Sequence, residues 1–177
     1  MNLNWLGLAS PPTIQTPRLT LRAVEESDFV HFYKLFSDPR VNEYIQLRWS
    51  EPTEARRIFD AFKFRFEKGG GIRWSVWLND TGEWVGNLGF HNHRPSEACI
   101  ERGLQIASQH WRKGYGRESS DAAMDWMKNT NAYKSVDAWV AVENIPTNSL
   151  LRRQGFRDTG ERKPFENLIL GRWLKEL

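Results

Sequence analysis

Cysteine is nearly absent from this sequence, since Cys99 is the only one among 177 residues. A single cysteine excludes an intrachain disulfide framework and suits a reducing compartment. Long apolar runs are also missing, because no stretch approaches the roughly 18 residues that a membrane-spanning helix needs. The first ten residues lack the basic segment and apolar stretch that are typical of a secretory signal. We therefore expect a soluble, cytoplasmic protein with no membrane partner.

Repeats, low-complexity tracts and long Pro/Gly/Ser linkers are missing as well, so nothing divides the chain. Its length fits one domain, because domains cluster at about 100–150 residues and split only well above that size. Hydrophobic residues make up 40% and charged residues 27% of the chain, which is ordinary globular usage and excludes a disordered or fibrous protein. We expect residues 1–177 to form a single domain.

The chain has little excess charge, because 25 lysines and arginines stand against 22 aspartates and glutamates and the net charge is only +3. This mild excess is compatible with a nucleic acid, an anionic cofactor or an ordinary solvated surface, so the positions of the basic residues matter more than their total. Aromatic residues are plentiful instead, with nine tryptophans and ten phenylalanines. Most of these rings should lie in the core, where they bury much surface per residue.

Strand and helix patterns follow one another along the chain. Residues 18–24 predict a strand, a helical pattern begins at Phe29, and a second helix should begin near Ser50 and end at the glycines of 69–71. Three strand patterns, at 72–78, 84–91 and 99–106, then predict an antiparallel meander with a hairpin turn at 79–82. A further helix, a strand at 136–142, a short helix at 147–154 and weaker strands at 156–160 and 167–173 complete the chain. This order predicts the α+β class with one mixed sheet.

The strongest functional signal is the segment from Ile106 to Arg117, where a strand leads into two closely spaced glycines and a helix begins at once. Glycines let the backbone approach a ligand, and the free amides of a helix start attract anions. With three cations nearby, the segment is a candidate pyrophosphate site. Its candidate residues are Arg112, Lys113, Gly114, Tyr115, Gly116 and Arg117. The alternative is a glycine-containing turn with ordinary surface cations.

A dinucleotide-binding fingerprint competes for the same segment. Gly114-Tyr115-Gly116 forms half of a G-x-G-x-x-G pattern, and Asp137 follows roughly twenty residues later. The match is poor, because Ser119 replaces the third glycine and Asp137 lies inside a predicted strand. The preceding strands also form a hairpin meander and not repeated βαβ units.

Several motifs in a fixed order extend over nearly the whole chain. Together they resemble the GNAT superfamily of N-acetyltransferases, in the branch of the ribosomal-protein N-terminal alanine and serine acetyltransferases (RimJ/RimL-like). Trp111 departs from the arginine or glutamine of the wider superfamily, but tryptophan is common in this branch. The motifs are Thr16-Pro17-Arg18-Leu19-Thr20-Leu21-Arg22, Phe36-Ser37-Asp38-Pro39, Val85-Gly86-Asn87-Leu88-Gly89-Phe90, Trp111 to Gly116, Asn144-Ile145-Pro146-Thr147 and Gly155-Phe156.

The resemblance implies a single-domain GNAT-like α+β fold. A mixed, mostly antiparallel sheet of six to seven strands would be splayed between its fourth and fifth strands and flanked by about four helices. The two splayed strands would be 99–106 and 136–142, and the cosubstrate acetyl-CoA would lie between them. The chain would then act as an acyltransferase without a metal.

The resemblance also places the cofactor contacts. The pyrophosphate would bind the amides of residues 113–117, and the pantetheine arm would bond the backbone of Leu104, Gln105 and Ile106. Asn144 matches a family asparagine that contacts the pantetheine. Arg153 matches a basic position near the adenosine end.

Amide formation needs a neutral amine, a donor for the developing oxyanion and a proton source for the departing thiolate. A backbone amide near Leu104 to Ile106 is the predicted oxyanion donor. Glu101 matches a glutamate that removes the amine proton directly or through water; its alternative is an ion pair with Arg102 or Arg94. Thr147 occupies the place of a serine thought to bond the thiolate.

The proton donor for the departing thiolate is left open. Many relatives have a tyrosine where this chain has Leu151, and Thr147 could equally be the N-cap of a helix. His91, His93 and Cys99 flank one short connection, but no fourth ligand has suitable spacing, so we expect no metal and assign all three residues to the acceptor side. Trp49, Trp74 and Trp77 either line the amine pocket or lie in the core.

The predicted reaction is direct attack of a primary amine on acetyl-CoA in a ternary complex. The amine belongs either to a protein N-terminus, such as that of a ribosomal protein, or to a small molecule, and the sequence does not choose between them. Similar proteins are often homodimers, so a homodimer is one expectation. One alternative is a non-catalytic acyl-CoA-binding or regulatory domain of the same fold.

A second alternative is an RNA-binding module, based on the basic residues Arg56, Arg57, Arg65, Arg152 and Arg153. Acidic neighbours offset these charges, so no direct nucleic-acid partner is expected.

Overall fold

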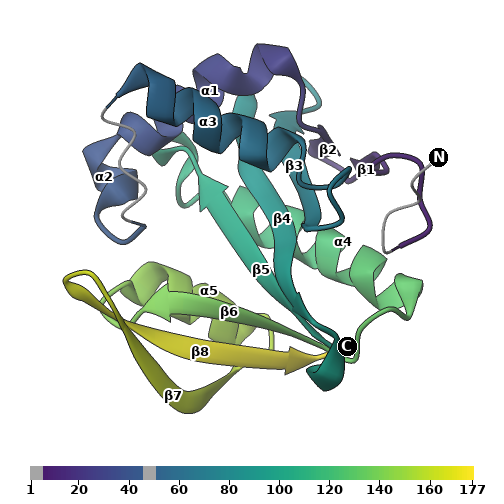
Figure 1. Ribbon diagram of the computed structural model, residues 1–177. Helices are drawn as coiled ribbons and strands as arrows, with labels where there is room; N and C mark the ends of the chain where they lie inside the picture. Colours follow the sequence, from purple (N-terminus) through teal and green to yellow (C-terminus); the bar gives the residue numbers. More distant parts are fainter. Residues whose placement is uncertain (1–5, 46–50) are drawn as a thin grey trace.

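Figure 1 shows the computed structural model of the chain, which describes residues 6–45 and 51–177. One sheet has the strand order β1-β2-β3-β4-β5-β6-β8-β7. Its strands are β1 (Ile14–Gln15), β2 (Leu19–Ala23), β3 (Gly71–Leu78), β4 (Trp84–Arg94), β5 (Cys99–Ile106), β6 (Ser135–Ala141), β7 (Arg157–Phe165) and β8 (Leu168–Glu176). The α-helices of the described ranges are α1 (Phe29–Ser37), α2 (Pro39–Asn42), α3 (Pro52–Lys63), α4 (Tyr115–Thr130) and α5 (Ile145–Arg153). Over these ranges, no helix is both long enough and apolar enough to cross a membrane.

One face of the sheet is apolar. Ile72, Trp74 and Val76 on β3 all point to this face, because side chains two residues apart in a strand share a side. α4 lies across it, and the buried residues Ala123 and Met127 pack into the same core. In Figure 1, α4 lies behind the strands that it covers.

The opposite face of the sheet carries polar side chains, although helices cover it. Arg73, Ser75 and Asn87 point to it and are buried. α1 and α3 lie together above this side in Figure 1 and contribute an aromatic cluster. The ring of Phe62, on α3, contacts the guanidinium of Arg73 at 4.4 Å from the ring centroid, which is a cation–π contact.

The sheet divides between β5 and β6. These parallel strands pair only from Cys99 with Ser135 to Glu101 with Asp137. Beyond that point they separate, so that the two strands form a V in Figure 1, and we call the space between their edges the opening. The opening therefore has a closed end near Glu101 and a mouth near Ile106.

Most predicted elements are confirmed. The class is α+β with one mostly antiparallel sheet, the division falls between the predicted strands, and β5 has the predicted bounds. The described residues form eight strands and five α-helices, slightly more than predicted. The additional elements are very short: β1 has 2 residues, and α2 has 4 residues with Asp38 as its N-cap.

Several boundaries differ from the prediction. α5 begins at Ile145 because Asn144 caps it. β4 continues to Arg94 through a bulge. β7 and β8 have 9 residues each and are longer than their sequence patterns, because they pair with each other along most of their length. α3 ends at Lys63, before the glycines, and the expected start at Ser50 lies outside the described residues.

Candidate acetyl-donor and acceptor site

The start of α4 holds the predicted phosphate segment. Gly114 is the N-cap with a φ of 85°, a left-handed conformation that glycine adopts without strain. The amides of Arg117 and Glu118 donate to the Gly114 carbonyl oxygen at 3.1 and 3.0 Å. The helix start thus leaves the amides of Gly114, Tyr115 and Gly116 without an intrahelical carbonyl, as an anion site requires.

The predicted cations surround this turn. Arg112, Lys113 and Arg117 are exposed, and Arg117 forms a surface pair with Asp121 at 3.4 Å. Such pairs contribute about 0–1 kcal/mol, so Arg117 can exchange its partner for a phosphate at little cost. Arg112 has a φ of 62°, and strained non-glycine residues of this kind cluster at functional turns.

A brace from the first strands fixes the same turn. The Arg18 guanidinium donates to the Glu118 carboxylate at 2.6 Å and to the Lys113 carbonyl at 3.0 Å, and it lies over the Tyr115 ring. Thr16 Oγ1 donates to Glu118 at 2.6 Å. Burial raises the pKa of Glu118, but the bonds from Thr16 and Arg18 outweigh it and hold that pKa below its ordinary value. Thr16 and Arg18 belong to a motif seen in the sequence, but the sequence does not reveal that they hold the start of α4.

The edge of β5 that faces β6 supplies free backbone groups. Past Glu101 it has no ladder partner among the described strands, so groups of Leu104, Gln105 and Ile106 that face the opening can bond a ligand. The Ile106 carbonyl already accepts from Trp111 Nε1 at 2.7 Å. The α4 start packs against the mouth, since a Cβ on Gly116 would lie 3.4 Å from the Ile106 side chain and 3.5 Å from that of Leu104.

The start of α5 holds two more predicted residues. Asn144 Oδ1 accepts from the Thr147 amide at 3.2 Å, so Asn144 is the N-cap and the alternative of Thr147 as the cap is wrong. Asn144 and Thr147 therefore lie within one turn, beside the carboxyl end of β6. Leu151 is fully buried in the core, and Arg153 is exposed on the last turn of α5.

Glu101 lies at the closed end of the opening. Its carboxylate accepts from Asn92 Nδ2 at 3.0 Å and lies 3.5 Å from His91 Nε2. Asn92 has a φ of 49° and sits in the bulge between His91 and Arg94. Bulges redirect side chains next to active sites, and this one aims Asn92 at Glu101.

The alternative ion pairs of Glu101 are wrong. Arg102 is on the opposite face of the sheet, where it donates to Ser120. Arg94 donates to Asp137. Both arginines are therefore committed to other partners.

The protonation of Glu101 follows from opposing effects. Burial raises its pKa, while hydrogen bonds from His91 and Asn92 and the charge of Lys163 lower it, so that the net pKa lies below the ordinary value. Burial lowers the pKa of His91 in spite of the neighbouring carboxylate. His91 is therefore a neutral imidazole at neutral pH and acts on Glu101 as a hydrogen-bond donor.

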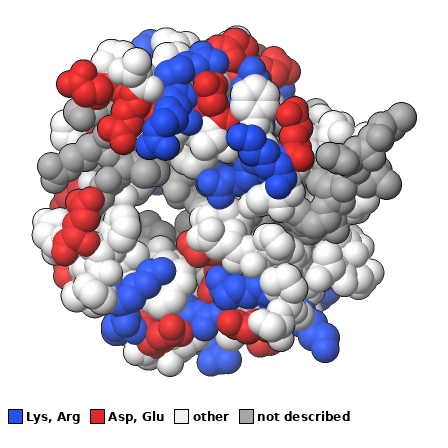
Figure 2. All heavy atoms as spheres, viewed as in Figure 1, with Lys and Arg blue, Asp and Glu red and all other residues white. Residues whose placement is uncertain are grey.

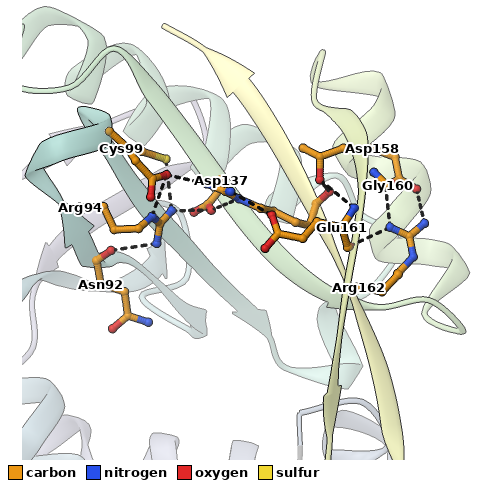
Figure 3. A network of polar contacts seen from close by, with 11 residues as sticks. Asn92, Arg94, Cys99, Asp137, Asp158, Gly160, Glu161 and Arg162 are labelled. Atoms are coloured by element: carbon orange, nitrogen blue, oxygen red, sulfur yellow. Dashed lines mark hydrogen bonds and ion pairs between the residues drawn. The ribbon is translucent and has the colours of Figure 1, made fainter.

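The polar network in Figure 3 fixes the closed end. Asp137, on β6, is fully buried and accepts from Arg94 at the end of β4 and from Arg172 on β8, the latter at 2.7 Å. Arg172 also contacts Glu97 at 3.1 Å and Glu161 at 3.0 Å. One buried carboxylate thus connects the two halves of the sheet where they meet.

The remaining predicted acceptor residues divide between site and core. Cys99 is buried and accepts from Arg94 Nη2 at 3.2 Å. Trp74 is fully buried in the core, Trp77 packs beside α1, and Trp49 lies outside the described residues. Across residues 6–45 and 51–177, no group of three or more His, Cys, Asp or Glu side chains could hold a metal ion.

A separate pocket of ≈ 200 Å³ lies between α1 and the segment that follows β5. His31 and Asp38 line one side and Ser108 and Gln109 the other. No predicted site residue lines this pocket, so we do not assign the acetyl donor to it.

Free amides and cations thus lie at one end of the separated strands, and a carboxylate lies at the other end. The sequence matches the acetyltransferase (GNAT) domain over residues 18–157. The chain belongs to the GNAT family. It is accordingly an acyltransferase whose cosubstrate is acetyl-CoA.

Several relatives of this GNAT protein are known by sequence. The uncharacterized N-acetyltransferase YoaA of Bacillus subtilis is 29% identical over 150 residues, which cover 84% of this chain and 85% of that protein. The uncharacterized protein YkkB of the same organism is 30% identical over 131 residues, covering 71% and 73%.

Solved structures share the fold of this GNAT chain. An acetyltransferase from Agrobacterium tumefaciens has a TM-score of 0.80 at 23% identity, covering 96% of this chain and 97% of that one. RimL, a ribosomal L7/L12 alpha-N-protein acetyltransferase in complex with coenzyme A, has a TM-score of 0.84 at 18% identity, covering 94% and 98%. The predicted GNAT-like fold is thereby confirmed.

Proposed function

We propose that this GNAT enzyme transfers an acetyl group from acetyl-CoA to a primary amine in a ternary complex, as a member of the RimJ/RimL-like branch. The observation that carries the proposal is the placement of Glu101 at the closed end of the opening and of the free α4 amides at its mouth. The strand from Glu101 to Ile106 spans about 17 Å at the usual rise per residue. An extended pantetheine arm can therefore reach from the phosphate site at the start of α4 to the neighbourhood of Glu101.

The donor supplies the acetyl group as a thioester, whose carbonyl carbon accepts a nucleophile. At the mouth, the amides of Gly114, Tyr115 and Gly116 hold the pyrophosphate, and Arg112 and Lys113 add charge. The free edge of β5 orients the arm, and Asn144 bonds it from the other side. Arg153 is assigned to the adenosine end.

The acceptor amine is deprotonated at the closed end. The Glu101 carboxylate attracts the ammonium form and takes its proton directly or through water, while His91 and Asn92 hold the carboxylate in place. A backbone amide of Leu104 to Ile106 donates to the oxygen on which charge develops. The Thr147 hydroxyl donates to the departing sulfur.

Two classes of acceptor are compatible with this chemistry. The RimL neighbour is described as acting on the α-amine of ribosomal protein L7/L12, which supports a protein N-terminus, and small amines form the other class. A cytoplasmic location and a homodimer belong to the same proposal. The single buried thiol suits the location.

A two-part experiment tests the activity. Calorimetry with the purified full chain should show acetyl-CoA binding, and a free-thiol assay should show release of coenzyme A with at least one pool of N-terminal peptides, amino acids or polyamines. Donor binding without thiol release in any pool would leave the fold as a binding domain and contradict the proposal.

A further inference from the structure

An unpaired arginine lies next to the proposed base, on the polar face of the sheet. Arg73 is only 5% exposed. Its Nη1 donates to Asn87 and to Gln105 Oε1, the latter at 3.1 Å, while its Nε has no partner among the described residues. Burial lowers the pKa of Arg73 to about 9, so the group is still a cation at neutral pH.

Arg65 is a second cation in the same cluster. It follows α3 and is partly exposed, and its side chain forms no hydrogen bond or ion pair with any described residue. Arg65 and Arg73 both contact the Phe62 ring, at 5.5 and 4.4 Å from its centroid. Burial lowers the pKa of Arg65, and the charge of Glu101 raises it, so Arg65 lies close enough to Glu101 to feel its charge.

The strand register places Arg73 near Glu101. Arg73 pairs with Gly89, and Gly89 pairs with Gly103, which is two residues from Glu101 on the same face of β5. A Cβ on Gly103 would lie 3.3 Å from Arg73 Nη2. Two residues of a strand span about 7 Å, so Arg73 and Glu101 are separated by roughly the size of one small zwitterion.

The charges of this cluster do not balance. Lys163 from β7 also acts on Glu101, whereas His91 is neutral at neutral pH. Glu101 is the carboxylate that faces these cations, and Asn92 and His91 already occupy it. A buried charge without a counter-charge is costly, and a protein keeps one where a ligand supplies the partner.

Basic side chains on the surface near this cluster are compatible with an anionic ligand. Figure 2 shows a hollow between the half with α1 to α3 and the half with β6 to β8, with basic side chains above and below it and acidic side chains among them. Positive charge around a cleft raises the local concentration of anionic substrates.

We propose that Arg65, with Arg73 behind it, binds a carboxylate that the acceptor carries next to its amine. This proposal rests on the proposed acetyl transfer and names its substrate class. Glu101 binds the amine and Arg65 the carboxylate, so the acceptor bridges the two groups. Such a carboxylate belongs either to a free α-amino acid or to the side chain of an acidic first residue in a peptide.

Matched acceptor pairs test the proposal by binding. The protein saturated with coenzyme A is titrated calorimetrically with an amino acid and its amide, and with peptides that begin with aspartate or asparagine. We expect the carboxylate member of at least one pair to bind about 10- to 100-fold more tightly, the range of charge-assisted hydrogen bonds. Equal binding within both pairs, or no binding of any member, would overturn the proposal.

Variants locate the effect. Arg65→Met should abolish the preference, and Arg65→Lys should retain part of it because the charge remains but the two-pronged donor is lost. Arg57→Met is the control, since Arg57 is exposed on α3 and, among the described residues, pairs only with Glu54. A preference that survives Arg65→Met would also overturn the assignment.

The same proteins separate this proposal from the proposed activity. If amines are acetylated without regard to a neighbouring carboxylate, the anion site is refuted and the acetyl transfer stands. If the carboxylate preference in binding is present but no acceptor releases thiol, the acetyl transfer is refuted and the anion site stands.

Discussion

Glu101 is held by neighbours that keep it ionised and oriented. Its lowered pKa makes it a weak base for an ammonium group, which favours a route in which the proton passes on to water. The same lowered pKa keeps the carboxylate charged at any pH above its ordinary value of 4.5. Its negative charge is therefore present throughout the range in which amines lose their protons.

The substitution Glu101→Gln should lower kcat about 100-fold, the lower limit for a general base, throughout pH 6–9. Acetyl-CoA affinity should change less than about twofold by calorimetry, because Glu101 is remote from the phosphate turn. Glu67→Gln is the control, since Glu67 is exposed after α3. Wild-type turnover in Glu101→Gln would remove this residue from the mechanism.

Single residues were only partly predictable from sequence. The position in a family strand predicts the role of Glu101, but its contacts with His91 and Asn92 depend on a bulge that the strand pattern does not show. The sequence leaves Thr147 equally open as a helix cap or as a partner of the thiolate, and the structure gives the cap to Asn144. The cation pair Arg65 and Arg73 comes from segments that only the folded sheet brings together.

The α4 start is the element on which donor binding depends. Gly114→Val would place a β-branched residue at a φ of 85°, at a cost of about 1–2 kcal/mol, with its Cβ 3.2 Å from Arg18 Nη2. Both effects disturb the amides, so the acetyl-CoA dissociation constant should rise at least 10-fold by calorimetry.

The matched control for this change is Gly82→Val. Gly82 has a φ of 66° in the β3–β4 turn and open space around its Cβ position. It should lose similar stability with unchanged acetyl-CoA affinity. An unaltered dissociation constant in Gly114→Val would contradict the phosphate site.

Elements with strong periodicity were predicted well and short ones poorly. β5 and the hairpin before it follow from alternation and a turn signal. β1, at 2 residues, has no period to detect. The length of β7 could not be predicted, because its exposed and mostly polar residues pair with β8 through the backbone and show no apolar pattern.

At the scale of the whole molecule, Asp137 joins the two halves of the sheet. Asp137→Asn would leave the arginines Arg94 and Arg172 without their buried counter-charge. Removing one partner of a buried ion pair lowers the free energy of unfolding by about 3 kcal/mol. This loss corresponds to a fall in Tm of roughly 6–12 °C for a chain of this size.

Asp158→Asn is the matched control. It removes a carboxylate seen in the same view of Figure 3, but Asp158 and Arg162 form a surface pair with side chains 40% and 39% exposed. We expect a loss below about 1 kcal/mol. Thermal unfolding of both variants gives the comparison, and equal Tm values would contradict the structural role of Asp137.

The fold could be predicted from the sequence better than the site, because the site depends on contacts between residues far apart in the chain. Alternation and glycine position predict strands and turns locally. The brace between Arg18 and Glu118 joins positions 100 residues apart. Nothing in the spacing of these residues indicates that they meet, so the support of the phosphate turn became visible only in three dimensions.

The early end of β5–β6 pairing leaves two strand edges facing each other inside the protein. Unsatisfied edges normally invite a strand from another chain, which leads to aggregation. Here the two edges converge toward Glu101, so an inserted polypeptide strand could pair with both edges over only part of its length. A thinner ligand can follow both edges further toward Glu101, so the convergence of the strands selects against a polypeptide as the group that completes the sheet.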